Sequence, residues 1–365
     1  MTAQLERKRR FRGLHLLEAL ATPHSIDRYL ELLHPMLVLR EIRGEVTSVH
    51  RTTRDSVTLT IRPNRRWRGF TAGQHVRVGV EINGVRHTRY YSPATSERSR
   101  DGRFELTVKA HDSGRVSRWL HANARRGLVL HLSPAEGEFT LPTTRPDRVL
   151  LVSGGSGITP VMSMLRTLTD EGHRGEIVFL HYAYTEADVP YLNALRELAA
   201  RHDNVRLLLA YTDVEGGDLH GFFTEEHLRA AAPWFAETDT YLCGPPGLMA
   251  GARQVFDRLG VAHRLRTEDF APVPITVDAE DATGEVTFGR SATTAPNSGR
   301  TLLEQAEAAG LKPEFGCRMG ICFTCTSVKT SGCTRDVRNG ELSTDPEEEI
   351  QICVSVPVGD VAIDI

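Results

Sequence analysis

Four cysteines near the C-terminal end constrain this 365-residue chain more than any other feature. Cys317, Cys322 and Cys325 follow the spacing C-x4-C-x2-C, and 27 residues separate the last of them from Cys353. This spacing is typical of a 2Fe–2S cluster held by four thiolates. A zinc site would usually have two paired C-x2-C knuckles, and the sequence has one such pair. No pair of histidines replaces two of the cysteines, which excludes a Rieske centre.

Composition excludes several other classes of protein. The 44 Lys and Arg residues against 47 Asp and Glu leave a net charge of −3, which does not favour bulk nucleic-acid binding. No run of about 18 apolar residues exists, so the sequence predicts no transmembrane segment. The basic run 7–10 and the leucines after it resemble a signal peptide, but Glu18 interrupts the apolar stretch and no cleavage site follows. Six cysteines are too few for a disulfide scaffold, and we expect a cytoplasmic protein.

Charge is divided unevenly along the chain. Residues 275–365 contain 7 Lys and Arg against 15 Asp and Glu, a net charge of −8. The preceding 274 residues hold the remaining 37 and 32, a net charge of +5. This asymmetry predicts separate domains, one of which docks electrostatically. The alternative is that the acidic surface only keeps a small domain in solution.

Hydrophobic periodicity divides the chain into four parts, of which residues 1–42 form an N-terminal extension. Ser25 would cap an amphipathic helix there, and Pro35 would end it. The apolar positions of this helix are Ile26, Tyr29, Leu30 and Leu33. We expect the helix to pack on the body of the protein; a helix lying on a membrane surface is the alternative.

The second part, residues 43–141, alternates apolar and polar residues, as at Val57, Leu59 and Ile61. Turns such as Asn83-Gly84 separate the alternating runs, and one helix is expected near 116–124. This pattern predicts an antiparallel β-barrel.

The pattern changes at Arg148, where a continuous apolar run at 149–152 predicts a strand buried on both faces. Strands and helices then alternate, which predicts a parallel α/β sheet. We place this third part at 147–270, ahead of a short linker, and the last domain at 275–365. The sequence therefore predicts a multidomain protein with an antiparallel barrel, an α/β domain and a smaller α+β domain.

Residues 275–365 resemble plant-type ferredoxins beyond the cysteines. The similar stretches are 301–304 on the expected helix and 351–355 around Cys353. The resemblance implies a β-grasp fold with Cys317, Cys322, Cys325 and Cys353 as the iron ligands. Cys333 is outside the pattern and is expected to be a spare thiol.

Residues 43–270 resemble the ferredoxin–NADP reductase superfamily. Arg89-Tyr90-Tyr91-Ser92 matches its flavin signature, and Gly114-Arg115-Val116-Ser117 stands at an expected helix start. The resemblance implies that Arg89 pairs with flavin phosphate, as guanidinium geometry favours. It implies that Tyr91 packs on the flavin and that Ser92 reaches the isoalloxazine N5 region. The diphosphate is expected on the backbone N–H groups of Gly114, Arg115, Val116 and Ser117, and Lys109 joins the cofactor-binding set.

FAD is the expected flavin, because the barrel resembles flavohaemoglobin-type reductase modules, including the stretch Glu136-Gly137-Glu138-Phe139. FMN is the alternative, since it occurs in reductases with the same order of domains.

A glycine turn follows the first buried strand and predicts a pyrophosphate site at a helix N-terminus. It departs from G-x-G-x-x-G because Pro160 replaces the third glycine. The superfamily resemblance implies that Cys243-Gly244-Pro245 lies by the nicotinamide and that Glu268-Asp269-Phe270 ends the module beside the flavin. The residues expected to bind nucleotide or flavin here are Gly154, Gly155, Gly157, Ile158, Thr159, Cys243, Gly244, Pro245 and Phe270.

The choice of nucleotide depends on residues 184–188, after the second strand of the α/β domain. Glu186 and Asp188 disfavour a 2′-phosphate and can accept a hydrogen bond from a ribose hydroxyl. We therefore expect NADH. NADPH is the alternative, if Arg201 or Arg206 approaches this loop.

The order of the domains predicts an NAD(P)H-dependent electron-transfer reductase. Electrons would pass from NAD(P)H through FAD and the 2Fe–2S cluster to an oxygenase or a fatty-acyl desaturase. The chain is similar to actinobacterial reductases that serve such enzymes, which allows peripheral contact with a membrane partner. No residue is expected to perform acid–base catalysis. The alternatives are a redox-sensing iron–sulfur interaction protein and a reductase whose acceptor is a free electron carrier.

Overall fold

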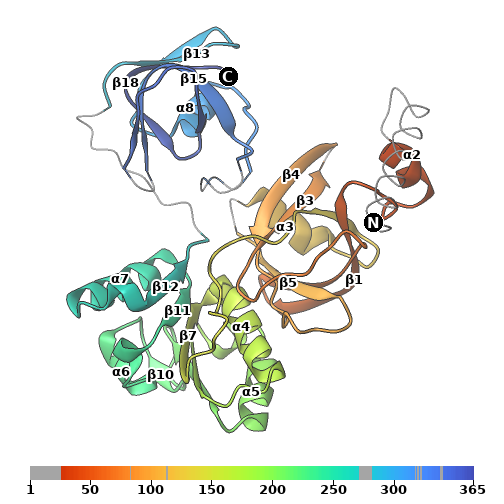
Figure 1. Ribbon diagram of the computed structural model, residues 1–365, viewed down its shortest axis with the longest axis vertical. Helices are drawn as coiled ribbons and strands as arrows, with labels where there is room; N and C mark the ends of the chain where they lie inside the picture. The colour runs from red at the N-terminus through yellow and green to blue at the C-terminus, as the bar shows by residue number, and fades with distance from the viewer. Residues whose placement is uncertain are drawn as a thin grey trace, which may run out of the picture. The chain divides into compact units, whose positions relative to one another are not determined.

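The computed structural model describes residues 26–82, 84–111, 114–270, 282–316, 318, 320, 323–337 and 340–365 (Figure 1). The cap Ser25, the turn residue Asn83, most of the expected linker and the cysteines Cys317 and Cys322 lie outside the described residues. The chain divides into two compact units. The first comprises residues 1–86 and 90–269, and the second comprises residues 87–89 and 270–365.

The first unit begins with the expected helix, α2 (Ile26–Leu33). Asp27 of this helix is buried, and its carboxylate accepts the backbone N–H groups of Leu39 at 2.6 Å and Arg40 at 3.1 Å. Glu31, one turn later, forms an ion pair with Arg43 at the start of the sheet. These contacts hold the helix against the body of the unit.

A six-stranded antiparallel, barrel-like sheet follows, in the order β4-β3-β6-β1-β2-β5. The alternating residues Val57, Leu59 and Ile61 are buried in its core, as their pattern predicts. The expected helix forms one residue earlier than predicted, as α3. The bounds are β1 (Ile42–Thr53), β2 (Ser56–Pro63), β3 (Val76–Ile82), β4 (Val85–Tyr91), β5 (Phe104–Lys109), α3 (Arg115–Asn123) and β6 (Val129–Leu132).

The α/β part of the same unit is a six-stranded parallel sheet in the order β10-β9-β8-β7-β11-β12. The apolar run 149–152 lies in its central strand and is fully buried, with alternate side chains in two hydrophobic cores. The bounds are β7 (Arg148–Gly154), α4 (Ile158–Asp170), β8 (Glu176–Ala183), α5 (Leu192–Arg201), β9 (Val205–Tyr211), β10 (Leu219–His220), α6 (Glu225–Ala231), β11 (Thr240–Cys243), α7 (Pro246–Arg258) and β12 (Leu265–Glu268).

Strand order reverses beside β7, because the chain moves from β7 to β8 and β9 on one side and later to β11 and β12 on the other. In open parallel sheets, ligands bind outside the carboxyl ends of the strands at such a switch point. The glycine turn after β7 and the Cys-Gly segment after β11 both lie at this edge.

The second unit is a mixed sheet in the order β14-β13-β18-β15-β16, with β17 paired to β15. Its helix α8 begins with a reciprocal capping box between Thr301 and Glu304, two of the residues that suggested a ferredoxin. The α+β fold is thus as predicted. The bounds are β13 (Glu285–Phe288), β14 (Thr293–Pro296), α8 (Leu302–Ala308), β15 (Thr326–Asp336), β16 (Leu342–Ser343), β17 (Glu348–Gln351) and β18 (Ser355–Ile363).

None of the helices in the described part of the chain has the length and apolarity needed to cross a bilayer.

Candidate functional site

The glycine turn after β7 is built for close contact with the segment after β11. A Cβ atom on Gly157 would lie 2.2 Å from the carbonyl oxygen of Cys243 and 2.6 Å from the amide nitrogen of Gly244. Gly155 has a φ of +52°, a left-handed conformation that favours glycine. The structure therefore requires glycine at these positions and brings the two predicted nucleotide motifs together.

The helix that follows this turn, α4, has no side chain among the described residues that caps its N-terminus with a hydrogen bond. The first N–H groups of a helix have no partner within the helix and attract anions. Thr159 directs its hydroxyl back to the carbonyl of Ser156 at 3.3 Å, which stabilises the turn. The N–H of Ile158 donates to the carbonyls of Gly155 and Ser156 within the turn. A small glycine turn at a helix N-terminus fits a nucleotide diphosphate.

The flavin motif runs along β4 into the loop after it. Arg89 donates a hydrogen bond to the carbonyl of Thr88 at 2.7 Å, and the half-buried Tyr91 packs against the barrel core. Ser92, the next residue, is buried. The strand thus carries the motif from the barrel surface to the junction with the α/β sheet.

At this junction a carboxyl group and an imidazole meet. Glu268, the last residue of β12, is paired in register with Cys243 of β11. Its Oε1 is hydrogen-bonded to Nδ1 of His75 at 2.8 Å, and the Ser92 hydroxyl lies beside the same carboxyl group. Ser92 of the flavin motif and Cys243 of the Cys-Gly segment after β11 therefore both lie next to Glu268.

Burial dominates the electrostatics of this cluster. It raises the pKa of the Glu268 carboxyl, and the neighbouring Asp269 acts in the same direction, while His75 and Ser92 partly oppose the shift. Burial also raises the pKa of the Cys243 thiol well above its ordinary value, helped by the negative charges of Glu268 and Asp269. Cys243 is therefore a neutral thiol at physiological pH and not a nucleophile.

The cluster also has hydrogen-bonding capacity that the described residues do not use. The Oε2 of Glu268 and the Nε2 of His75 are buried without a hydrogen-bond partner among them. Buried polar atoms in native proteins are normally satisfied, so these atoms fit a polar ligand. A planar ring system with nitrogen and oxygen atoms, such as an isoalloxazine or a nicotinamide, satisfies this requirement.

His75 was not among the residues predicted from the sequence. It begins the strand region after Gly73, whose missing Cβ would lie 1.9 Å from the carbonyl oxygen of Phe139. His75 is also bridged through its backbone to Glu136, and its ring meets Tyr90 edge-on at 5.0 Å. The only feature of the sequence that could have pointed to His75 is its place between Gly73 and the alternating apolar run that begins at Val76.

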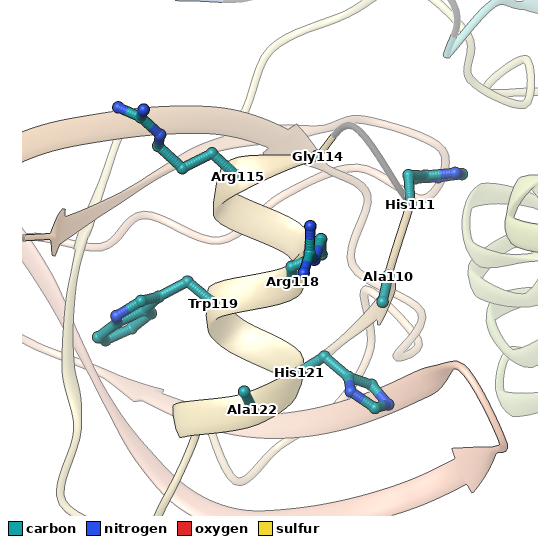
Figure 2. A pocket seen from close by; sticks show the side chains of 8 residues that line it. All are labelled: Ala110, His111, Gly114, Arg115, Arg118, Trp119, His121 and Ala122. Atoms are coloured by element: carbon teal, nitrogen blue, oxygen red, sulfur yellow. The ribbon is translucent and has the colours of Figure 1, made fainter.

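A cavity lies at the start of α3, where the sequence predicts the flavin diphosphate. Its volume is about 700 Å³, within the range of small-molecule sites. Figure 2 shows His111, Arg118 and His121 on one side of the helix, with Arg115 and Trp119 on the other. The described residues that line it are Ala110, His111, Gly114, Arg115, Arg118, Trp119, His121 and Ala122, and among these there are two arginines and no carboxylate.

The turn into α3 is fixed by Ser117. Its hydroxyl donates to the carbonyl of Gly114 at 3.2 Å and accepts the N–H of His111 at 3.4 Å. A Cβ atom on Gly114 would lie 2.3 Å from this hydroxyl. Val116 is buried in the barrel core, so Gly114 and Ser117 shape the turn while Val116 anchors it. This arrangement fits a phosphate group at the helix start.

Lys109 lies where the barrel meets the α/β sheet. Its ammonium group forms an ion pair with Asp55 at 3.2 Å and lies 5.8 Å from the ring centre of Tyr184. It also contributes to lowering the pKa of His181, which burial lowers to about 3. His181 is fully buried on β8 and hydrogen-bonded to Ser153 at 2.8 Å.

The loop after β8 is more internally paired than its sequence suggests. Asp188 accepts hydrogen bonds from the backbone and the hydroxyl of Thr185, and Glu186 forms an ion pair with Arg196 at 2.9 Å. Arg206 donates to backbone carbonyls at the end of α6, and Arg201 pairs with Glu197. The arginine beside this loop is therefore Arg196, which the sequence did not single out.

Two of the four predicted iron ligands are described. Cys325 and Cys353 are both buried in the core of the second unit, and the backbone N–H of Ile352 donates to the carbonyl of Cys325 at 3.2 Å. Cys333 is half-exposed on β15, opposite Val358 of β18. Buried cysteines on adjacent segments, with Gly320 in a left-handed conformation, fit a cluster with thiolate ligands.

Phe270, which the superfamily resemblance places beside the flavin, has 36% of its surface exposed.

Family models match three successive segments. They are described as an oxidoreductase FAD-binding domain over residues 43–141, an oxidoreductase NAD-binding domain over 151–254 and a 2Fe-2S iron-sulfur cluster binding domain over 286–358.

Two curated relatives cover most of the chain. An NADPH oxidoreductase of Mycobacterium tuberculosis is 38% identical over 97% of this chain and 93% of its own length. A glycine betaine monooxygenase reductase subunit of Pseudomonas aeruginosa is 33% identical over 81% of this chain and 87% of its own length.

Solved structures share the fold. Phthalate dioxygenase reductase has a TM-score of 0.58 at 23% identity, covering 88% of this chain and 97% of its own. The FAD/NAD-binding domain of a nitric oxide dioxygenase from Vibrio cholerae has a TM-score of 0.57 at 25% identity, covering 64% of this chain and 100% of its own.

Proposed function

We propose that this chain, which belongs to the NAD(P)H-dependent oxidoreductases of the ferredoxin–NADP reductase superfamily, delivers electrons from NADH to an oxygenase or a fatty-acyl desaturase. Members of its family join an FAD-binding, an NAD-binding and a 2Fe–2S domain in one chain. The observation that carries the proposal is the convergence of Ser92 and Cys243 on Glu268. One junction thereby holds the flavin motif beside the nicotinamide motif.

A flavin held by these residues would supply two-electron chemistry toward the nicotinamide and one-electron chemistry toward the cluster. We assign the binding of its phosphates to Arg89 and to the turn Gly114–Ser117, with Lys109 nearby. Tyr91 packs on the ring, and Ser92 and His75 hold its polar edge together with Glu268. The open cavity at α3 and its two arginines support this assignment.

We assign the nicotinamide nucleotide to the switch point of the parallel sheet. Gly154, Gly155 and Gly157 allow the backbone to approach the diphosphate, and Ile158 and Thr159 begin the helix whose N-terminus would attract it. Cys243, Gly244 and Pro245 form the wall beside the nicotinamide. Phe270 is the last residue of the proposed nucleotide domain and is assigned a position beside the flavin.

NADH is the proposed donor because carboxylates occupy the loop after β8. Glu186 faces Arg196, and a 2′-phosphate would have to displace this carboxylate to reach the guanidinium. The name of the Mycobacterium tuberculosis relative makes NADPH the competing choice.

We assign the cluster to Cys317, Cys322, Cys325 and Cys353. The proposed domains are the extension 1–42, the FAD-binding barrel 43–141, the nucleotide domain 147–270 and the ferredoxin domain 275–365. We place the protein in the cytoplasm, with peripheral contact to the membrane where its acceptor is a membrane enzyme. Relatives named as subunits of a glycine betaine monooxygenase and a 3-ketosteroid monooxygenase support an oxygenase-type acceptor.

Reconstitution tests this function directly. The purified protein, NADH and an oxygenase component without its own reductase should yield hydroxylated product in proportion to NADH consumed. NADH should give a higher kcat/KM than NADPH in the same assay. Reduction of the flavin by NADH while the cluster stays oxidised would overturn the proposed function, and a higher kcat/KM with NADPH would overturn the choice of donor.

A further inference from the structure

Phe323 has an unusual conformation for its place in the sequence. It lies between the predicted ligands Cys322 and Cys325, and its side chain is 70% exposed. Its φ is +54°, in the left-handed region, which is strained for a residue other than glycine. Neither local backbone preference nor burial of the ring accounts for a phenylalanine here.

The backbone that carries this ring is held in place. Thr326 directs both its N–H, at 3.2 Å, and its hydroxyl, at 2.8 Å, to the carbonyl oxygen of Phe323. The turn leads directly into β15, and Cys325 within it is buried. The aromatic ring is therefore presented to solvent from a defined turn beside a buried iron ligand.

An acidic strand adjoins this turn. Strand β17 pairs with the first residues of β15, with Gln351 opposite Thr326, Glu349 opposite Val328 and Glu348 opposite Lys329. Glu348 and Glu349 are exposed. Their register places two carboxylates a few residues from the turn.

The nearby lysine does not neutralise this surface. Lys329 is fully buried, and its ammonium group donates to the carbonyl oxygens of Gly332, Ser343 and Asp345 at 2.6–3.1 Å. The two exposed carboxylates of β17 therefore keep their negative charge, in a domain whose net charge is −8 over residues 275–365.

We propose that Phe323 is the apolar anchor of the surface on which the protein electron acceptor docks, and that Glu348 and Glu349 form part of its charged rim. The matching partner surface is an apolar pocket beside a redox centre, surrounded by Lys and Arg. Interfaces commonly place an aromatic anchor at the centre and steering charges at the rim. This inference rests on the proposed function, because it assumes that electrons leave through the cluster.

The test uses the cluster-loaded full chain and cytochrome c, a small basic haem protein, as the acceptor. Phe323→Ala and Phe323→Gly should each raise the KM for cytochrome c about tenfold. Glycine suits a left-handed backbone, so a defect in Phe323→Gly cannot be attributed to strain. Leu342→Ala, at another exposed apolar residue of the same unit, is the matched control and should leave the KM unchanged.

A second acceptor separates docking from electron release. Hexaamminecobalt(III) is a small cation without an apolar surface, and its reduction should be the same in the wild type and in both Phe323 variants. The double variant Glu348→Gln/Glu349→Gln should slow cytochrome c reduction at ~20 mM salt and flatten its salt dependence up to ~500 mM, because rim charges act mainly on encounter.

Two results would overturn the inference. One is an unchanged KM for cytochrome c in both Phe323 variants. The other is slower reduction of the cluster by NADH in these variants, which would mean that the ring serves electron entry. Failure of the proposed function itself is distinguishable, because the wild-type cluster would then not be reduced by NADH at all.

Discussion

Among single residues, Glu268 combines burial with a position between two predicted cofactor motifs. A buried carboxyl group is expensive to ionise unless a donor faces it, and His75 provides that donor at 2.8 Å. His75 therefore holds the Glu268 carboxyl group in position, besides the contact with the flavin ring that we propose for it. Cys243, Asp269 and Ser92 complete the polar surroundings of this carboxyl group.

We predict that His75→Phe slows reduction of the bound flavin by NADH and moves the pH profile of this step to higher pH. Loss of the hydrogen bond raises the pKa of Glu268 further, because Ser92 alone then opposes the effects of burial and Asp269. His75→Gln keeps a donor near the carboxyl group and should lie closer to the wild type. Stopped-flow absorbance between pH 5 and 9 measures the effect.

A profile of His75→Phe that coincides with the wild type would contradict this role. Loss of stability alone would not mimic the prediction, because it would lower the amount of folded protein without moving the profile. A cost of about 1–3 kcal/mol is expected from the unpaired carboxyl group, which thermal unfolding would register.

Cys243 and Ser92 were predicted as site residues because they stand in recognisable motifs, whereas His75 has no such signal. The contact between His75 and Glu268 spans 193 residues, and a distance of that kind becomes visible only after two domains have packed. Glu186 and Asp188 were expected to face a ribose, and their side chains prove to have protein partners as well. Local pairing of this kind leaves no trace in composition.

Among secondary-structure elements, those with strong periodicity were predicted best. The run 149–152 forms the centre of β7, and the alternating residues 57–61 lie in β2. Strand β12 was not predicted, because its sequence Leu-Arg-Thr-Glu is short and lies at the sheet edge without an apolar run. Tertiary pairing with β11, rather than propensity, makes it a strand.

Two histidines in strands, the fully buried His181 and the half-buried His131, predict the response of the first unit to acid. Burial lowers the pKa of His181 on β8 from 6.5 to about 3 and that of His131 on β6 from 6.5 to about 4. In the unfolded chain both regain ordinary values, so between pH 6.5 and 4 the unfolded state binds more protons. The free energy of unfolding should therefore decrease as the pH is lowered through this window, by up to about 1.4 kcal/mol per pH unit for each histidine.

Urea unfolding of the flavin-loaded protein, followed by flavin fluorescence from pH 7 to 4.5, measures this slope. His131→Gln keeps a polar group near Glu41 and should remove one histidine's share of the slope. An unfolding free energy that is constant or rises as the pH falls from 6.5 to 5 would contradict the assignment.

At the scale of the whole molecule, the chain is a reductase module and an acidic ferredoxin-like module, each with its own hydrophobic core. The order of the domains was predictable because each carries a motif with a physical requirement of its own. The identity of the acceptor was not, because recognition of a partner depends on surface residues such as Phe323 whose meaning emerges only from their exposure and conformation.

We predict that Cys353→Ser loses iron while retaining flavin and the reduction of ferricyanide by NADH. Cys353 lies in the core of the second unit, and compact units with separate cores are expected to fold separately. Iron and flavin contents per chain measure the outcome. Cys333→Ser is the matched control, since it should retain both, and loss of flavin in Cys353→Ser would contradict the modular arrangement.

The most direct test of electron flow within the chain is an anaerobic titration with NADH, followed by visible absorbance and electron paramagnetic resonance. One flavin accepts two electrons and one 2Fe–2S cluster accepts one, so we predict full bleaching after about 1.5 NADH per chain, with the signal of a reduced cluster. Bleaching that ends at about one NADH per chain, with an oxidised cluster, would show that the flavin does not pass electrons on and would contradict the central claim.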